Sequence, residues 1–207
     1  MTTVHIVDSG ICNLGSIRKA LSRAGADVEI ATMGSEVRHA KHVILPGVGS
    51  FPAGMQALSD RGFTDVLPEV VHNGAWVLGI CLGMQLLFNE GHEFQRTKGL
   101  GFIPGTVRAI NAKGQPVPHI GWNKIIPRRE SVLLPDDTVE PWLYFVHSYV
   151  CEPADDSQVL GESEYGESFC SVVQNGRVYG IQAHPEKSQH AGAAMLKAFV
   201  NLGEDSA

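Results

Sequence analysis

A cysteine lies between two glycines in the string Gly79-Ile80-Cys81-Leu82-Gly83, after an apolar run typical of a strand and before one typical of a helix. A sharp strand-to-helix turn exposes a nucleophile in this way, and glycines leave room for its close backbone contacts. Cys81 would lie at the N-terminus of the helix, where the helix dipole favours a thiolate. The alternative is a buried structural cysteine, which is common in apolar runs.

A histidine and a carboxylate stand two residues apart in the string His184-Pro185-Glu186. In an extended segment, residues i and i+2 point the same way, so Glu186 would orient the imidazole of His184. Cysteine, histidine and carboxylate together form a candidate triad for attack of a thiolate on a carbonyl, with His184 as the general base. Taken alone, the string would more often be an ion pair on a surface loop.

Two further features would suit such a site. Pro46-Gly47-Val48-Gly49-Ser50 forms a turn after a predicted strand, and its backbone N–H groups, with that of Leu82, would hold an oxyanion; a bare tight turn explains the string equally well. Gln85 follows Cys81 by four residues on the same helical face, so it would either hold a polar substrate or lie half-buried.

His92-Glu93 lacks the second histidine of a zinc site, and the sequence predicts no metal or cofactor.

Strand and helix patterns alternate in the half of the chain that contains Cys81. This alternation predicts an open, mostly parallel twisted sheet with helices on both faces. The carboxyl ends of its strands would bring the 46–50 turn and Cys81 to one rim. Strands are predicted at residues 4–7, 28–30, 42–45 and 76–80, and helices at 17–24, 52–60, 64–73 and directly after Cys81.

The second half of the chain changes character and contains several short β-like runs. Asn175-Gly176 between two of these runs is a strong hairpin signal, so we expect added antiparallel strands that extend the sheet. A closing helix is predicted over residues 189–202, with Ala193, Leu196 and Val200 in step. Without a repeat or a linker, residues 1–207 are predicted to form a single domain. The β-like runs are residues 106–110, 142–150, 171–173 and 178–181.

Composition narrows the class of protein. The net charge of −6 argues against a nucleic-acid binder. The longest apolar run, residues 75–88, is shorter than the ~20 residues that a membrane helix needs. The four cysteines form no C-x-x-C pair, and the N-terminus lacks a secretory pattern, so we expect a cytoplasmic protein.

These strings resemble a known family. G-I-C-L-G-M-Q at residues 79–85, P-G-V-G at 46–49 and H-P-E at 184–186 are similar to class I (triad) glutamine amidotransferases, in the right order over almost the whole chain. Longer strings resemble one branch of that family, the glutaminase subunits of imidazole glycerol phosphate synthases in histidine biosynthesis. They are P-H-I-G-W-N at 118–123, Y-F-V-H-S-Y at 144–149 and H-P-E-K-S at 184–188.

The resemblance implies a role for each matching residue. Cys81 would attack the side-chain amide of L-glutamine and form a γ-glutamyl thioester. His184 would protonate the departing ammonia and later activate water, while Glu186 would orient His184. The oxyanion hole would use the backbone of Val48, Gly49 and Leu82, and the glutamine would contact Gly49, Gln85, Glu93 and Ser148.

The resemblance also implies a partner. Ammonia would pass to a separate (β/α)₈-barrel cyclase subunit in a heterodimer, which would make imidazole glycerol phosphate and aminoimidazole carboxamide ribotide. Asn13, Trp122, Tyr144 and Lys187 lie where the family meets that partner. Ser9 and Cys12 depart from the aromatic residue and glycine that are usual there. The chain has no barrel repeat, so the synthase half, with its lyase activity, would be another chain.

Other readings remain open. A sibling amidotransferase subunit, such as that of anthranilate synthase or pyridoxal phosphate synthase, would share the cysteine turn and H-P-E but would not be expected to carry P-H-I-G-W-N before F-V-H-S-Y. A self-sufficient cysteine hydrolase or peptidase would turn over fully alone. A non-enzymatic interaction subunit with a relict triad is disfavoured, because Cys81, His184 and Glu186 are all present.

Overall fold

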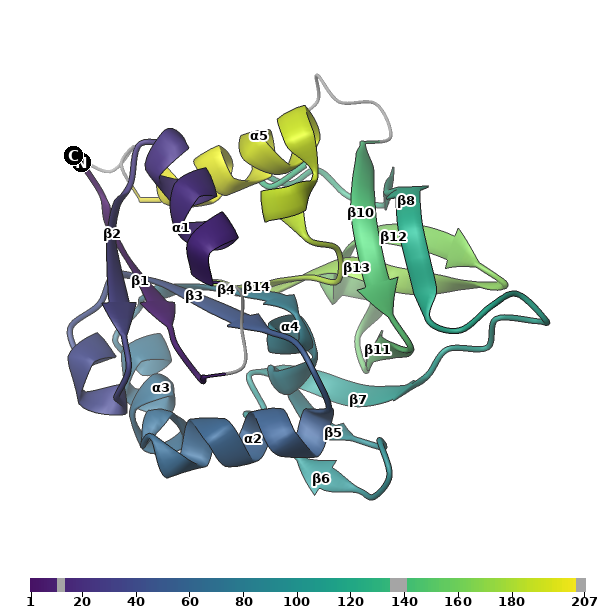
Figure 1. The fold of residues 1–207 in the computed structure, drawn as a ribbon, viewed down its shortest axis with the longest axis horizontal. Coiled ribbons are helices and arrows are strands. Elements are labelled where there is room, and N and C mark those ends of the chain that lie inside the picture. The colour runs from purple at the N-terminus through teal and green to yellow at the C-terminus, as the bar shows by residue number, and fades with distance from the viewer. Residues whose placement is uncertain (11–13, 135–140, 204–207) are drawn as a thin grey trace.

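The computed structural model describes residues 1–10, 14–134 and 141–203, and its centre is a parallel sheet covered on both faces (Figure 1). Helices α1 and α5 cover one face, and α2 and α3 cover the other, as the alternation of patterns predicts. The parallel strands run in the order β2 (Asp27–Ala31), β1 (Thr3–Val7), β3 (His42–Gly47), β4 (Trp76–Cys81) and β14 (Val178–Ile181). The helices are α1 (Leu14–Arg23), α2 (Phe51–Asp60), α3 (Phe63–His72) and α5 (Gln189–Val200).

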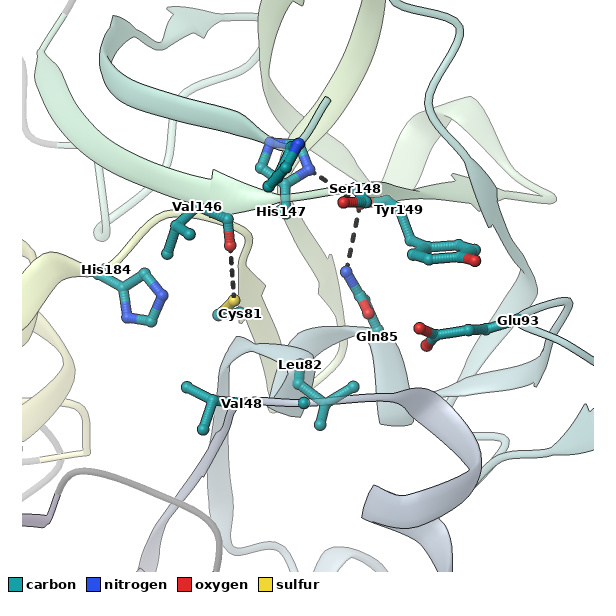
Figure 2. A pocket seen from close by; sticks show the side chains of 12 residues that line it. Val48, Cys81, Leu82, Gln85, Glu93, Val146, His147, Ser148, Tyr149 and His184 are labelled. Atoms are coloured by element: carbon teal, nitrogen blue, oxygen red, sulfur yellow. Dashed lines mark hydrogen bonds between the residues drawn. The ribbon is translucent and has the colours of Figure 1, made fainter. Parts of the chain in front are cut away.

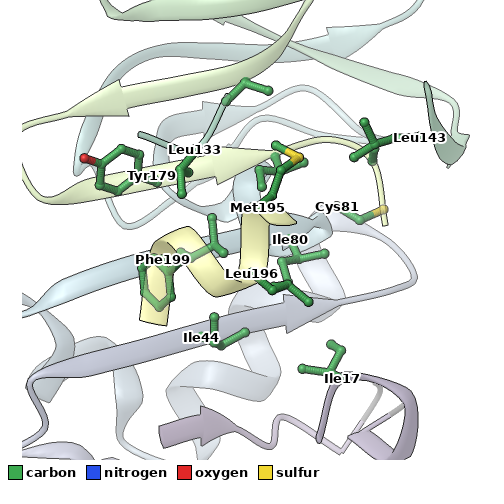
Figure 3. Close-up of a cluster of buried hydrophobic side chains, with 14 of the residues drawn as sticks. Ile17, Ile44, Ile80, Cys81, Leu133, Leu143, Tyr179, Met195, Leu196 and Phe199 are labelled. Carbon is green, nitrogen blue, oxygen red and sulfur yellow. The ribbon is translucent and has the colours of Figure 1, made fainter. Parts of the chain in front are cut away.

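Alternating side chains of the central strands divide the interior into two cores. Ile44 packs into the cluster beneath α1 and α5, whereas its neighbours Val43 and Leu45 pack into the cluster beneath α2 and α3. Figure 3 shows the first cluster, with Ile44 and Leu196 facing each other between β3 and α5. Successive strand residues point to opposite faces, so a strand with helices on both sides is apolar throughout. This explains why the central strands read as continuous apolar runs.

Antiparallel strands extend the sheet beyond β14, as the second-half patterns predict. β13 pairs with β14 across the Asn175-Gly176 turn, which confirms the hairpin. The described residues form a twelve-stranded sheet in which two strands, β12 and β9, lie off the main path. The pairing of β5 with β7 is parallel, and the other pairings among these strands are antiparallel. The added strands are β13 (Glu167–Asn175), β11 (Tyr149–Pro153), β7 (Ile103–Ala109), β5 (Phe88–Gly91), β6 (Thr97–Lys98), β12 (Val159–Tyr165) and β9 (Ile126–Pro127).

A separate ribbon of two antiparallel strands stands beside this sheet (Figure 1). β8 (His119–Lys124) and β10 (Trp142–His147) pair from His147 opposite His119 to Trp142 opposite Lys124. The sequence treats residues 142–150 as one run, but the structure ends β10 at His147 and begins β11 at Tyr149 in the large sheet. Ser148 therefore marks a change of sheet that local patterning does not reveal.

The closing helix and the helix after Cys81 also differ in detail from expectation. α5 ends at Val200, with Leu196 and Val200 buried but Ala193 exposed. α4 (Leu82–Leu86) has only five residues, because the chain turns at once into β5. Short 3-10 turns occupy η1 (Gly34–Val37), η2 (Asp156–Gln158) and η3 (Pro185–Lys187). Within the described ranges, no helix is long and apolar enough to cross a membrane.

Candidate active site

Cys81 occupies a strained turn between β4 and α4. Its backbone has φ 55 and ψ −115, a region that costs a residue with a side chain on the order of 1–3 kcal/mol. The glycines on either side have no space for a side chain: a Cβ on Gly79 would lie 2.6 Å from the Gly83 carbonyl oxygen, and one on Gly83 would overlap the Leu45 carbonyl. The turn thus holds the Cys81 side chain where β4 meets the first turn of α4.

The candidate triad is assembled by two neighbouring parallel strands. β14 pairs with β4, with Ile181 opposite Ile80. Cys81 is the last residue of β4 and His184 follows the carboxyl end of β14, so both lie at the same edge of the sheet. Both residues line one pocket, and the imidazole of His184 points toward the Cys81 sulfur (Figure 2). Nδ1 of His184 lies 2.8 Å from Oε1 of Glu186, and both side chains are buried. The carboxylate therefore fixes the ring with Nε2 on the Cys81 side.

The electrostatics of the site favour an imidazolium. Burial opposes a charge on His184, but interactions with Cys81 and Glu186 outweigh it and raise the pKa of His184 to about 9. An opposite charge or an acceptor close to a histidine has this effect. The Cys81 thiol donates to the Val146 carbonyl, with Sγ and O 3.8 Å apart, and Nε2 of His184 has no hydrogen-bond partner among the residues that the structure describes. Nε2 is therefore free to exchange a proton with sulfur or substrate.

Two buried polar residues support the triad, and sequence reasoning missed both. Nε2 of the fully buried Gln182 lies 3.8 Å from the Cys81 sulfur. Ser188 accepts from the Tyr144 N–H at 2.9 Å and donates to the His184 carbonyl at 2.6 Å. Ser188 thereby ties the segment that carries His184 to β10. Their only sequence signal is proximity to H-P-E.

The pocket beside Cys81 has a volume of about 260 Å³, which suits a small polar molecule. Glu93 accepts from the backbone N–H of Phe51 at 2.7 Å, so its carboxylate is fixed at the start of α2. Nε2 of Gln85 contacts the Tyr149 carbonyl at 3.2 Å and Oε1 of Gln182 at 3.1 Å. The structure brings together in this lining all the oxyanion and substrate residues expected from the sequence: Val48, Gly49, Leu82, Gln85, Glu93 and Ser148.

The expected partner residues that the structure describes also lie together. The rings of Trp122 and Tyr144 are 6.1 Å apart on the β8–β10 ribbon, and Nζ of Lys187 lies 5.9 Å from the Tyr144 ring. Trp122 and Lys187 are exposed. Asn13 lies outside the described residues.

Three features define a class of protein: the strained turn at Cys81 between β4 and α4, which we call the elbow, the buried His184–Glu186 pair, and a sheet covered by helices on both faces. The family model of class-I glutamine amidotransferases matches residues 5–202. The chain belongs to this family.

Known relatives narrow the class. The chain is 43% identical over 206 residues to imidazole glycerol phosphate synthase subunit HisH of Shouchella clausii, a match that covers 97% of this chain and 99% of that one. It is 44% identical over 211 residues to the subunit of the same name from Salinibacter ruber, covering 98% and 94% of the two chains. The corresponding Chlorobium luteolum protein is 39% identical over 197 residues, covering 95% and 98%.

Solved structures share the fold at much lower identity. A crystal structure of a glutamine amidotransferase matches with a TM-score of 0.75 at 19% identity, over 96% of this chain and 97% of that one. The structure of PurLQS from Thermotoga maritima matches with a TM-score of 0.75 at 17% identity, over 97% and 98%. These likenesses concern the fold alone.

Proposed function

We propose that this chain is the glutaminase subunit of an imidazole glycerol phosphate synthase. It hydrolyses L-glutamine to glutamate and ammonia and supplies the ammonia to a synthase subunit in histidine biosynthesis. The observation that carries this is that Cys81 and His184 line one pocket, with Glu186 buried against the far side of the imidazole, in a chain that aligns almost end to end with subunits of that name.

In the proposed reaction, the Cys81 thiolate attacks the side-chain amide carbon of glutamine. A C–S bond forms, and the carbonyl electrons move to oxygen, which accepts hydrogen bonds from the Leu82 N–H and from the backbone at Val48 and Gly49. The C–N bond then breaks as His184 gives its proton to the departing ammonia. Water, deprotonated by His184, then attacks the thioester carbon, and the C–S bond breaks, which releases glutamate and restores the Cys81 thiolate. Glu186 keeps the imidazole oriented in both steps.

The rest of the pocket offers groups for the glutamine backbone and amide. The Glu93 carboxylate, held by the start of α2, would pair with the α-ammonium group, because opposite charges in a partly buried site attract strongly. Gln85, Gly49 and Ser148 would hold the remaining polar atoms. Gln85 is 5% exposed, and the pocket has room for one small amino acid.

The partner is proposed to dock on the outer face of the β8–β10 ribbon, next to the pocket. Residues directly opposite each other in an antiparallel pair share a face, so Trp142, Tyr144 and Val146 point outward with Lys124, Trp122 and Ile120. Trp142, Trp122 and Ile120 are 56%, 45% and 59% exposed, a cluster of large apolar side chains typical of an interface.

By family resemblance, the partner is a (β/α)₈-barrel cyclase that forms a heterodimer with this chain and carries the lyase activity. Trp122, Tyr144 and Lys187 contribute to this interface, and we assign Asn13 to it as well. We further propose that residues 1–207 act as one domain in the cytoplasm, where the nucleotide substrate of a biosynthetic synthase is available.

A glutaminase assay with and without the cyclase subunit and its nucleotide tests the function. We expect release of glutamate that rises strongly when both are added, and its loss in Cys81→Ala. Cys170→Ala, which removes another buried thiol distant in sequence from the elbow, is the matched control and should stay active. Glutamate release by Cys81→Ala would refute the nucleophile. Full turnover without a partner would instead favour the self-sufficient hydrolase, and dependence on a different synthase would favour a sibling amidotransferase.

A further inference from the structure

Two buried histidines outside the triad touch each other, and one of them, His147, lines the glutamine pocket. His119 on β8 and His147 on β10 are 3% and 6% exposed, with Nδ1 of His119 2.9 Å from Nε2 of His147. The proposed chemistry gives neither of them a role. The ring of His119 stacks on Tyr165 at 4.0 Å between centroids, and His147 lies against Phe169.

The hydrogen bonds of this pair run in only one direction. Nδ1 of His147 is 2.9 Å from the Tyr149 carbonyl, which only accepts, so this nitrogen carries the proton. Burial keeps both rings neutral by lowering the pKa of His147 to about 3 and that of His119 to about 4. Nε2 of His147 is therefore an acceptor, and Nδ1 of His119 must donate to it.

The same logic extends the chain of bonds to β8. Nε2 of His119 is left as an acceptor, and it faces the side-chain amide nitrogen of Asn123 at 3.4 Å. That nitrogen also donates to the Glu164 carbonyl on β12 at 2.9 Å. Asn123 directly follows Trp122 of the proposed interface. Donors therefore run in one direction from Asn123 on β8 to the Tyr149 carbonyl, and the Asn123 amide is itself anchored to β12.

The pocket end of the chain lies where the strand changes sheets. The Tyr149 carbonyl accepts hydrogen bonds from Nε2 of Gln85 and from Nδ1 of His147, so two donors define its position. Ser148 connects β10 to β11 and lines the glutamine pocket together with Tyr149. β10 ends at His147 and β11 begins at Tyr149, and between them the Ser148 carbonyl accepts from the Ile110 N–H at 2.9 Å. The side-chain bonds to the Tyr149 carbonyl add to this backbone contact with the end of β7.

We propose that His119 is a positioning residue for glutamine binding: by donating to His147 it holds the 147–149 segment in the shape that the substrate requires. This inference rests on the proposed function of the pocket. His119 itself does not line the pocket, and it acts only through His147. Losing its donor leaves the His147 acceptor buried and unpaired, which loosens the Tyr149 carbonyl and Ser148.

Substitutions at His119 distinguish the effect of losing its N–H donor from the effect of losing its aromatic ring. His119→Phe keeps a ring to stack on Tyr165 but has no donor. His119→Asn places an amide N–H near the position of Nδ1, whereas His119→Gln places one near Nε2. Tyr165→Phe is the matched control, because it removes a hydroxyl bonded to the Pro116 carbonyl from the same ring stack and leaves the chain of bonds intact.

Glutamine kinetics of the complete complex with the cyclase subunit and its nucleotide provide the measurement. We expect His119→Phe and His119→Gln to raise the KM for glutamine about tenfold, equivalent to about 1.4 kcal/mol. The expected change in kcat is less than threefold, and His119→Asn and Tyr165→Phe should stay within about threefold of the wild-type KM. Alkylation of Cys81 by iodoacetamide, which does not need bound glutamine, should proceed at an unchanged rate.

Three results would overturn the inference. They are an unchanged KM in His119→Phe, an equal loss in the Asn and Gln variants, and a fall in melting temperature without a change in KM. If His119→Phe does not fold, the contrast between the Asn and Gln variants decides alone. A wild-type complex without glutaminase activity would instead refute the proposed function, so the two failures are distinguishable.

Discussion

At the scale of single residues, the Cys81 sulfur has a separate partner for each protonation state. The thiol donates to the Val146 carbonyl, and a thiolate would accept from the Gln182 amide on another side. The reactivity of Cys81 therefore depends on β10, which carries Val146, as well as on His184.

The raised pKa of His184 predicts how activity depends on pH. His184 is protonated below a pH of about 9 and loses the proton needed by the departing ammonia as pH rises through this value. We therefore expect kcat/KM for glutamine to fall above about pH 9. Glu186→Gln removes an anion that favours the imidazolium, so its alkaline limb should begin at lower pH, whereas Glu130→Gln, an exposed carboxylate elsewhere, should match the wild type.

The same shift affects stability with a definite sign. A histidine with a raised pKa in the folded state contributes stability below its ordinary pKa of about 6.5, and this contribution is lost between that value and about 9. Urea unfolding across this range should show a smaller decline in Glu186→Gln than in the wild type. Identical alkaline limbs and identical unfolding curves in the two proteins would contradict this account.

Residue type and spacing were enough to predict the triad, but not the residues that hold it. Cys81, His184 and Glu186 lie in short strings whose chemistry is local. Gln182 contacts a sulfur 101 positions away, and His119 bonds a ring 28 positions away. Such contacts depend on strand order and register, which a single sequence does not contain.

At the scale of elements, the turn at Cys81 is held in place because the backbones of β4 and α4 are in direct contact. Gly83 lies so close to the Leu45 carbonyl of β3 that no side chain fits. The short α4 therefore rests directly on the strand beside its own. The positive φ of Cys81 persists because this packing leaves the chain no other path.

Gly83→Ala should break this arrangement. Its methyl group would overlap backbone, which has less freedom to move than a side chain, so we expect a loss of at least about 3 kcal/mol in the free energy of unfolding by urea, together with loss of glutaminase activity. Gly176→Ala, at a hairpin glycine with positive φ and no atom nearby, controls for the loss of a glycine and should cost only about 1 kcal/mol. Equal costs in the two variants would show that α4 is free to shift.

Elements with strong local periodicity were predictable, and those defined by distant partners were not. The parallel strands and α1, α2, α3 and α5 agree with their predicted ranges to within a few residues. Strands β5, β6, β8, β9 and β12 were missed, and the 142–150 run was wrongly joined across Ser148. Residues 142–150 form a nearly continuous apolar and aromatic run, so their division between two sheets depends on which strands they meet.

At the scale of the whole molecule, the pocket and the exposed face of the ribbon share β10. The Tyr144 carbonyl accepts from the His184 N–H, and the Tyr144 N–H donates to the Ser188 hydroxyl. The Tyr144 side chain contacts Trp122 on the outer surface. A protein bound to this face would thus touch a strand that holds the catalytic segment.

Trp122→Ala should weaken binding of the proposed cyclase subunit. Large aromatic side chains at the centre of interfaces often contribute about 2 kcal/mol, or roughly thirtyfold in Kd. Titration calorimetry of the two subunits measures this, with Met33→Ala as the control, because Met33 is a comparably exposed apolar residue (48%) beside the opposite edge strand. A Kd unaffected by Trp122→Ala would place the interface elsewhere.

The adjacency of β4 and β14 has a wider consequence. Nearly a hundred residues separate these strands in the chain, yet they are neighbours at the centre of the sheet, and the whole intervening excursion returns to the same place. The spacing between sulfur and imidazole is therefore set by the direct pairing of two strands and not by the number of residues between them. The intervening residues supply both most of the pocket wall and the ribbon that the partner is proposed to meet, so one excursion of the chain joins amide cleavage to the delivery of its product.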